Sequence, residues 1–407
     1  MPDLTRDAEP APTGPLRGLR VVEFAQIIAG PLAGTLMADL GAEVIHVEPP
    51  GVGDPHRNTG PTKDGEALWW KAAARNKRSV TLNLHEPKAQ EIAHGLVAQA
   101  DIVIVTMRSS TVQKWRLDFA TLHAINPKLI FVQISGFGST TSRADDPGFG
   151  KVGEARSGTV YITGYPEHPP VHAGFSQGDA TTALMAAFAA MSALHQRDAD
   201  PEFDGEHIDL ALFESLFRLA DWQVIYYDQL GRTPERSGNR LANAPAAVVN
   251  TYLTADDTWI TITSATLRSV LNVVRMAGLD ESDYQTWEAQ RAGADEIDLA
   301  LRQWVSARTA QECLDAMRAH SVTGDRIFSM ADIVNDPIYA EREDIVTVDD
   351  AVLGPIRMQG VVPKLIRNPG NVWRSAPTLG QDNIDVFGRW LGMSVNECAE
   401  LASHGVI

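Results

Sequence analysis

The stretch LRGLRVVEFAQIIAGPLAGTLMADLGAEVIHVE, residues 16–48, decides the fold. Two short apolar runs within it, RVVEF at 20–24 and AEVIHVE at 42–48, are typical of buried strands. Between them, PLAGTLMADLG predicts a helix that ends at Gly41, since glycine is the usual residue just beyond a helix. A strand, a helix and a second strand in succession predict two parallel strands joined by a crossover helix.

The same unit is repeated further along the chain. SVTLNL at 79–84 precedes a helix that begins at Pro87, and the strand DIVIV follows at 101–105. Another helix pattern, DFATLHAIN, precedes the strand KLIFVQIS at 128–135. We therefore predict an α/β, Rossmann-like large domain, in which helices cover both faces of a parallel sheet.

The pattern changes after the last of these units. Residues 136–178 are rich in Gly, Pro, Ser and Thr and predict loops, followed by helices from Asp179 to about His195 and from Asp209 to about Leu230. VNTYLTADDTWITIT then predicts a hairpin turned at Asp256 and Asp257, with short helices beyond it. This change marks a second, smaller α+β domain inserted into the first.

The chain ends by returning to strand-like segments, IVTV and IRMQG, and to helices near 383–403. The domain prediction is therefore a flexible tail at 1–15, a large domain at 16–231, a small domain at 232–335, and the rest of the large domain at 336–407.

Composition restricts the class of partner. The chain has 407 residues and a net charge of −17, so its surface repels nucleic acid and anionic membranes. Its apolar runs are shorter than the ~20 residues that span a bilayer, and its polar start has no signal-peptide core. Two distant cysteines, Cys313 and Cys398, predict neither a disulfide framework nor a zinc site. These features are typical of a cytoplasmic protein.

The first strand–helix unit has two possible interpretations. AGPLAG supplies Gly30 and Gly34, and Glu48 ends the second strand where dinucleotide folds place a ribose-binding acid. The GxGxxG spacing is absent, however, so packing of the helix against the strand explains these glycines better than NAD binding does.

Basic residues flank two of the predicted strands. RNKRS at 75–79 precedes one strand, and Arg108, Lys114 and Arg116 follow another. Ligands bind at the carboxyl ends of parallel strands, and this chain is acidic elsewhere. A phosphate site is therefore possible here, although most such runs are solvated surface.

Asp179 begins a long segment without another charged residue before Arg197. Such an aspartate is commonly a helix N-cap, because its carboxylate accepts bonds from free backbone N–H groups. It can also be a nucleophile, as carboxylates are in other covalent mechanisms. In both cases the helix dipole favours the ionised carboxylate, so spacing alone leaves the two roles open.

Other common catalytic motifs are missing from the sequence. His172 and His195 have no partner at metal-ligand spacing, and no GxSxG elbow, P-loop or HExxH occurs. We therefore expect no metal and no nicotinamide cofactor.

The ordered set of segments resembles the class III CoA-transferases, the group that includes formyl-CoA:oxalate and carnitine CoA-transferases. The resemblance begins with the stretch at 16–48 and extends through NKRSVTLNL, ADIVIVTMR, INPKLIFVQISGFG, GDATTALMAAFAAMSALHQR and GEHIDLALFES. It ends in SAPTLGQDNIDVFGRWLGMSVNECAELASHGVI, so it covers nearly the whole chain from Leu16.

The resemblance implies that Asp179 attacks an acyl-CoA thioester and passes CoA to a carboxylic acid, through aspartyl anhydride and thioester intermediates. Coenzyme A is then a substrate, and neither ATP nor a metal is needed. It also implies an interlocked homodimer. The CoA contacts that it implies are Ile28, Ala29, Leu82, Asn83, Leu84, His85, Thr106, Met107, Arg108 and Lys114.

The chain departs from the family pattern at two places. Pro49 stands where relatives often carry a basic residue, which removes one possible phosphate contact. Gly150 stands where relatives commonly carry an acid, and Glu154 is too far along to be assumed its replacement. For an acceptor carboxylate, the candidate cations are Arg156, Arg236 and Arg240.

Phe149 and Gly150 also bear on a second activity of this fold. The α-methylacyl-CoA racemases carry a His-Asp pair at these positions, and a phenyl ring cannot act as a base. CoA transfer is therefore favoured over racemisation or epimerisation. A non-catalytic CoA-binding protein, whose acid is only a helix cap, remains a third hypothesis, and a nicotinamide oxidoreductase a distant fourth.

Overall fold

The computed structural model describes residues 11–241 and 243–407. Most of the predicted tail at 1–15 and one residue of the loop after 235 therefore lie outside the described residues. The described chain divides into two compact units. The first comprises the chain up to Ser157 together with Ala173–Leu219 and Pro337–Ile407, and the second comprises Gly158–His172 and Ala220–Asp336.

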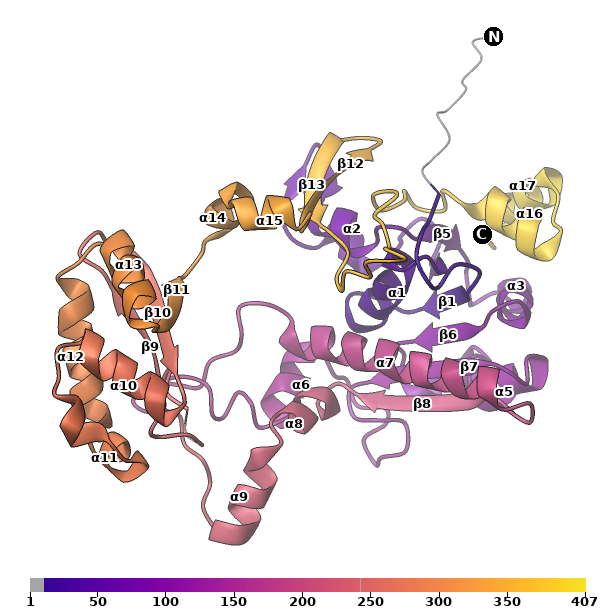
Figure 1. Cartoon of the computed structure of the whole chain (residues 1–407). Helices are drawn as coiled ribbons and strands as arrows, with labels where there is room; N and C mark the ends of the chain where they lie inside the picture. Colours follow the sequence, from indigo (N-terminus) through magenta and orange to yellow (C-terminus); the bar gives the residue numbers. More distant parts are fainter. Residues whose placement is uncertain (1–10, 242) are drawn as a thin grey trace. The chain divides into compact units, whose positions relative to one another are not determined.

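A parallel sheet of six strands forms the centre of the first unit, as the repeated strand–helix pattern predicts (Figure 1). Its order is β5-β2-β1-β6-β7-β8. The chain therefore starts in the middle of the sheet, extends to one side, and then returns past β1 to the other. The strands are β1 (Arg20–Phe24), β2 (Glu43–Glu48), β5 (Arg78–Thr81), β6 (Ile102–Val105), β7 (Ile130–Ser135) and β8 (Glu206–Ala211).

Helices bury both faces of this sheet because successive strand residues point to opposite sides. Val21 packs with α1 (Ala29–Asp39) and α7 (Gln177–Ala199) on one face. Val22 packs on the other face with α3 (Pro87–Ala98), α5 (Phe119–Ile125), α16 (Asn383–Leu391) and α17 (Val395–Ser403). The C-terminal helices thus complete the core of the unit that the N-terminal strands begin.

The two glycines of AGPLAG allow α1 to lie close to the sheet. A Cβ at Gly30 would overlap Ala25 and Thr106, and one at Gly34 would overlap the Glu23 carboxylate. This confirms the packing interpretation of these glycines.

The first unit also has smaller elements around the sheet. They are η1 (Pro55–Asn58), β3 (Thr62–Lys63), β4 (Glu66–Ala67), α2 (Leu68–Ala73), α4 (Ser109–Lys114), α6 (Gly150–Arg156), α8 (Glu214–Leu219), α15 (Pro337–Glu341), β12 (Ile345–Asp350) and β13 (Gly354–Gln359). Strands β12 and β13 form an antiparallel hairpin.

The second unit is built around an antiparallel sheet of β9 (Val248–Leu253), β10 (Trp259–Ser264) and β11 (Thr323–Arg326). Strands β9 and β10 form the hairpin that the sequence predicts, with Asp257 in a left-handed conformation at its turn. Its helices are α9 (Trp222–Leu230), α10 (Leu267–Met276), η2 (Glu281–Tyr284), α11 (Trp287–Ala292), α12 (Ala294–Ser306), α13 (Ala310–His320) and α14 (Met330–Asn335).

Two sequence predictions of secondary structure are wrong. The expected helix from Asp209 to Leu230 is instead the edge strand β8 followed by the separate helices α8 and α9. The first residues of this segment, Asp209 to Ala211, pair with β7, and that pairing overrides their helical periodicity.

The predicted loop at 136–178 contains the helix α6. Its two glycines lower its helix propensity and hide it from pattern reading. They also permit close packing, because a Cβ at Gly150 would overlap Asp179 and one at Gly153 would lie against Leu212.

Within residues 11–241 and 243–407, no helix combines the length and apolarity needed to cross a bilayer. Cys313 and Cys398 are both buried as free thiols.

Candidate active site

A cavity of about 650 Å³ opens at the carboxyl ends of the parallel strands. Every strand of the sheet contributes to its wall, through the residue or short loop at or just beyond its end. This edge, on both sides of the point where the strand order reverses, is where open α/β sheets bind ligands. One wall residue from each strand end, in sheet order, is Leu82, Pro49, Ile27, Thr106, Gly136 and Leu212.

The structure brings together almost all the residues for which the resemblance implies a role. Those that line the cavity are Asp179, Ile28, Ala29, Leu82, Asn83, Leu84, His85, Thr106, Met107 and Arg108. Lys114 is the exception: it is exposed at the end of α4 and is not among the lining residues. The next residue, Trp115, lines the cavity instead and packs edge-on to His85 at 5.7 Å between ring centroids.

The turn between β1 and α1 forms one wall and has an unusual backbone. Ile27 has a φ of 69°, which is unfavourable for a β-branched residue. Both carboxylate oxygens of Asp54 accept the Ile27 N–H at 3.1 Å, and the Ile27 carbonyl lies 2.8 Å from Nδ1 of His56. Buried polar groups therefore hold the strained turn in place.

Asp54 is itself supported by a buried charge network. The His46 ring lies between Glu23, at 2.7 Å, and Asp54, at 3.3 Å. Burial lowers the pKa of His46, but its bonds to Asp54 and Glu23 outweigh that effect and raise the pKa to about 9. The imidazole is therefore a buried cation at neutral pH, and it keeps the Asp54 carboxylate ionised beneath Ile27.

Asp179 is not a helix N-cap. Helix α7 begins at Gln177, two residues earlier than predicted, and Ser176 is its N-cap residue. Asp179 therefore lies inside the first turn, and its half-buried carboxylate faces the cavity. The cap interpretation of this residue is wrong.

The immediate neighbour of Asp179 is the helix α6. A Cβ at Gly150 would overlap the Asp179 carboxylate, so that carboxylate lies directly against the backbone of α6. One turn further along, the Glu154 carboxylate is buried and accepts the Gly178 N–H at 3.0 Å. Nζ of Lys151 lies 2.9 Å from Glu154. An acid does lie near Asp179, but it belongs to Glu154 rather than to the usual family position.

These surroundings raise the pKa of Asp179 to about 6. Burial is the largest cause, the negative charge of Glu154 adds to it, and the positive charge of Lys151 opposes both. The helix dipole favours ionisation of Asp179, as the sequence suggests, but it does not outweigh burial.

Lys151, which lines the cavity, is not among the residues predicted from the sequence, and Glu154 was set aside there as too far along the chain. The only signal in the sequence is their spacing of three residues, which places two side chains on the same face of a helix. That spacing is informative only if the segment is known to be helical.

Several other candidates lie away from the cavity or are already paired. RNKRS at 75–79 is at the amino end of β5, the opposite edge of the sheet, where Arg75 pairs with Asp39 and Lys77 with Glu23. These residues therefore form internal ion pairs rather than a phosphate site at the carboxyl edge.

The proposed acceptor cations are also occupied elsewhere. Arg156 lies over the rings of Phe137 and Phe213. In the second unit, Arg236 donates to backbone carbonyls, and Arg240 pairs with Asp295 and Asp298. Glu48, the possible ribose ligand, is buried and paired with Arg57 at 2.6 Å.

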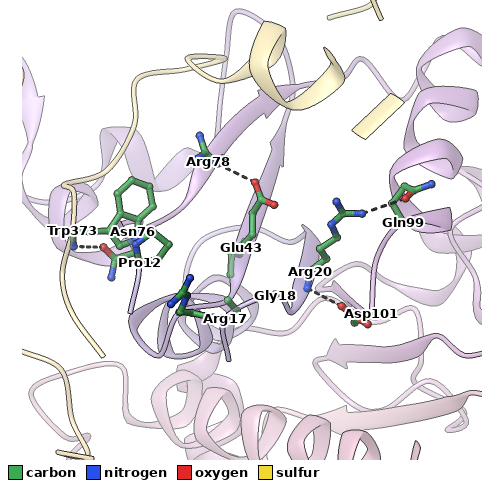
Figure 2. A pocket seen from close by; sticks show the side chains of 13 residues that line it. Pro12, Arg17, Gly18, Arg20, Glu43, Asn76, Arg78, Gln99, Asp101 and Trp373 are labelled. Atoms are coloured by element: carbon green, nitrogen blue, oxygen red, sulfur yellow. Dashed lines mark hydrogen bonds and ion pairs between the residues drawn. The ribbon is translucent and has the colours of Figure 1, made fainter. Parts of the chain in front are cut away.

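Figure 2 shows a second cavity, of about 610 Å³, lined by residues at the amino ends of the parallel strands. It lies where β1, β2 and β5 begin, and the charged side chains of Arg20, Glu43, Arg78 and Asp101 have partners. Glu43 pairs with Arg78 at 3.1 Å, Arg20 donates to Gln99 at 3.2 Å, and Asp101 accepts the Arg20 N–H. Its position at the amino edge distinguishes it from the candidate active site.

Comparisons with known proteins agree with the fold. The chain is 38% identical to a succinyl-CoA–D-citramalate CoA-transferase of Chloroflexus aurantiacus, over 97% of this chain and 99% of that protein. It is 34% identical to the β subunit of a succinyl-CoA–L-malate CoA-transferase of the same organism, over 97% and 98% of the two chains.

A crystal structure of a CaiB/BaiF family protein from Brucella suis matches with a TM-score of 0.81 and 28% identity, over 93% of this chain and all of that one. The model of CoA-transferase family III matches residues 16–383. The chain is therefore an enzyme that belongs to CoA-transferase family III.

Proposed function

We propose that this enzyme transfers CoA from an acyl-CoA thioester to a carboxylic acid through covalent intermediates on Asp179. The observation that carries the proposal is the position of that carboxylate, which opens into the cavity at the strand ends. Its raised pKa also makes it a better nucleophile than an ordinary aspartate, since a more basic carboxylate attacks a carbonyl more readily.

The reaction proceeds by exchange of acyl bonds. An Asp179 oxygen attacks the thioester carbonyl carbon, the C–S bond breaks, and a mixed anhydride and CoA thiolate form. The thiolate attacks Cγ of Asp179 and releases the donor acid as a carboxylate, which leaves an aspartyl-CoA thioester. The acceptor carboxylate then attacks the same Cγ, and the released thiolate attacks the acceptor acyl carbon. Asp179 is regenerated as a carboxylate, and no proton or redox equivalent is consumed.

The cavity wall is chemically suited to CoA. Thr106, Met107 and Arg108 follow β6, and the exposed Arg108 guanidinium can pair with a phosphate. We propose that Trp115 and His85 bind the adenine ring by aromatic contact, since both line the same wall. Lys114, one residue from Trp115, remains a proposed phosphate contact at the rim of the cavity.

The relatives suggest an acceptor class. Their names join succinyl-CoA to citramalate or malate, and all three acyl parts derive from dicarboxylic acids. We propose dicarboxylic acids as the first acceptors to test. Among the cavity-lining residues, Arg108 and Lys151 carry the positive charges that could attract the acid.

We also propose a homodimer of interlocked chains in the cytoplasm. Leu184 is 58% and Phe188 69% exposed on α7, and two large apolar side chains one turn apart on a helix are typical of an interface. One relative is named as a β subunit, so a second kind of subunit is the alternative outcome of an assembly test.

The test is exchange between a labelled acyl-CoA and a free acid. Asp179→Ala should abolish exchange while CoA still binds, as measured by calorimetry, because the variant loses the nucleophile but keeps the cavity wall. Retained exchange would refute the proposal. Racemisation remains the second candidate because of the fold; deuterium uptake at the α-carbon without acyl exchange would select it over transfer.

A further inference from the structure

Helix α6 packs against the start of α7 in a way that places a second carboxylate beside the proposed nucleophile. Gly150 brings the α6 backbone against the Asp179 carboxylate, and a Cβ at Gly178 would in turn overlap the Gly150 carbonyl. The two helices thus meet through glycines. This close approach lets Glu154, one turn after Gly150, reach the backbone of α7.

Glu154 is held from two sides. Its carboxylate accepts the Gly178 N–H at 3.0 Å, which fixes the peptide next to Asp179. Nζ of Lys151 donates to its two oxygens at 3.1 and 2.9 Å. The side chain of Glu154 is only 1% exposed, so its charge acts on Asp179 with little screening by water.

Lys151 connects Glu154 to the loop that precedes α7. Besides Glu154, its ammonium donates to the carbonyls of Ala173 and Phe175 at 2.9 and 2.8 Å. The side chain remains 46% exposed and lines the cavity. Lys151 therefore places a positive charge beside Glu154, and it fixes the loop leading into the first turn of α7.

We propose that Glu154 is a positioning residue for the nucleophile: held by Lys151, its buried carboxylate fixes the first turn of α7 and places a negative charge beside Asp179. The inference rests on the proposed function, in which Asp179 is the nucleophile. Acylation of Asp179 removes its charge and therefore relieves the repulsion from Glu154. The negative charge of Glu154 thus favours both the anhydride and the aspartyl-CoA thioester of Asp179 over its free carboxylate.

Among the described residues, the charges that act on the pKa of Asp179 are those of Glu154, which raises it, and Lys151, which lowers it. Other ionisable groups face the same space or belong to elements packed against α7. Glu48 is paired with Arg57, and Glu214 on α8 accepts the Ala211 N–H. The rest of the cavity contributes His85, Arg108 and Asp146.

The experiment is the pH profile of kcat/KM for CoA exchange in a pair of charge variants. In the wild type, the acid limb should have a midpoint near the Asp179 pKa of about 6. Glu154→Gln keeps an oxygen that can accept the Gly178 N–H but removes the charge, so the limb should move to lower pH by about one unit. Lys151→Met should move it to higher pH.

Control variants separate charge from structure. Glu91→Gln on α3 removes a carboxylate that is 67% exposed and should leave the limb unchanged. Glu154→Asp keeps the charge but shortens the side chain, so it should slow exchange while leaving the limb near its wild-type position. If Glu154→Gln fails to fold, Lys151→Met alone tests the inference, which requires that its acid limb move to higher pH.

The inference would be overturned if the acid limb of the pH profile stayed in place in Glu154→Gln and Lys151→Met, or moved in the same direction in both. That result would leave the proposed function intact provided that Asp179→Ala is inactive. Conversely, exchange by Asp179→Ala would remove the nucleophile itself, whatever the charge variants show.

Discussion

Gly150 lies directly against Asp179, and its lack of a side chain has a structural consequence. The Asp179 carboxylate occupies the space that a Cβ would need. Any side chain at this position would therefore displace Asp179. Glu154 supplies a negative charge from one turn further along, and its carboxylate reaches the backbone of α7 rather than the cavity.

Gly150→Ala should fold but lose most of its exchange activity. Alanine favours a helix by up to about 1 kcal/mol over glycine, so the free energy of unfolding should not fall greatly, while the Asp179 side chain is forced aside. The matched control is Gly174→Ala, where an added Cβ meets nothing within 4 Å. Equal activity of the two variants in the exchange assay would contradict the described position of Asp179.

The raised pKa of Asp179 also predicts how stability depends on pH. Because the folded pKa, about 6, lies above the ordinary 3.8, the folded protein binds this proton more tightly than the unfolded chain. Its favourable contribution is present below pH 4 and is lost as pH rises through 6. At pH 8 the wild type buries an ionised carboxylate, whereas Asp179→Asn buries a neutral amide. The free energy of unfolding of the variant should therefore be higher by about 1–3 kcal/mol.

Urea unfolding at pH 8 and at pH 4 measures this difference, which should shrink at the lower pH. A variant that is less stable than the wild type at both values would indicate that Asp179 stabilises the helix, as the rejected cap interpretation would require.

Sequence reasoning at this scale identified Asp179 but could not assign its role. A cap and a nucleophile share the same residue type and spacing, and only the start of α7 at Gln177 separates them. Lys151 was not predicted, and Glu154 was judged too distant, because glycine-rich sequence hides the helix that carries them. Burial of the Glu154 charge depends on tertiary packing, which the local sequence does not encode.

At the scale of elements, the turn from β1 to α1 is maintained against the preference of its own sequence. Ile27 adopts a positive φ because Asp54 binds its N–H and His46 holds Asp54. The buried network of Asp54 and His46 thus fixes the Ile27 turn, which forms the wall of the cavity next to Ile28 and Ala29. No local pattern in the sequence indicated this role for Asp54.

Asp54→Ala should both destabilise the protein and weaken acyl-CoA binding. It leaves His46 as a buried cation with one partner lost, which costs about 3–5 kcal/mol, and it frees the Ile27 turn. Denaturant unfolding and the KM for acyl-CoA measure the two effects. Asp198→Ala, which removes a side chain 70% exposed on α7, should change the free energy of unfolding by less than about 0.5 kcal/mol. An unchanged KM in the Asp54 variant would show that the turn does not shape the site.

The elements that the sequence predicted best are those whose signal is local. The buried strands β1, β2, β6 and β7 and the helix beginning at Pro87 follow from short apolar runs and helix-start residues. Strand β8 was missed because its pairing with β7 joins segments far apart in the chain. Such long-range pairing is invisible to a reading of periodicity.

At the scale of the whole molecule, the order of the sheet explains where the site is. The chain reverses direction across the sheet between β1 and β6, and the loops beyond these two strands separate to leave the cavity. The parallel α/β class could be predicted from repeated strand–helix units. The predicted bounds of the inserted domain rest on a change in the sequence pattern, and the interlocked dimer rests on family resemblance; both remain predictions.

Assembly can be tested through the exposed face of α7. Phe188→Glu should shift the protein from dimer to monomer, because a charge in an apolar interface cannot be solvated. Light scattering after gel filtration measures the mass. Lys88→Glu on α3, at a side chain 58% exposed, is the control and should leave the mass unchanged. A wild type that is monomeric at micromolar concentration would contradict the predicted dimer.

The central claim is that Asp179 becomes covalently acylated, and peptide mass spectrometry after hydroxylamine trapping tests it most directly. The enzyme is incubated with a donor acyl-CoA in the absence of acceptor, treated with hydroxylamine, and digested. We predict a hydroxamate on the peptide that contains Asp179 and on no other, and its absence from Asp179→Ala. Rapid CoA exchange by an enzyme whose Asp179 peptide stays unmodified would contradict the account.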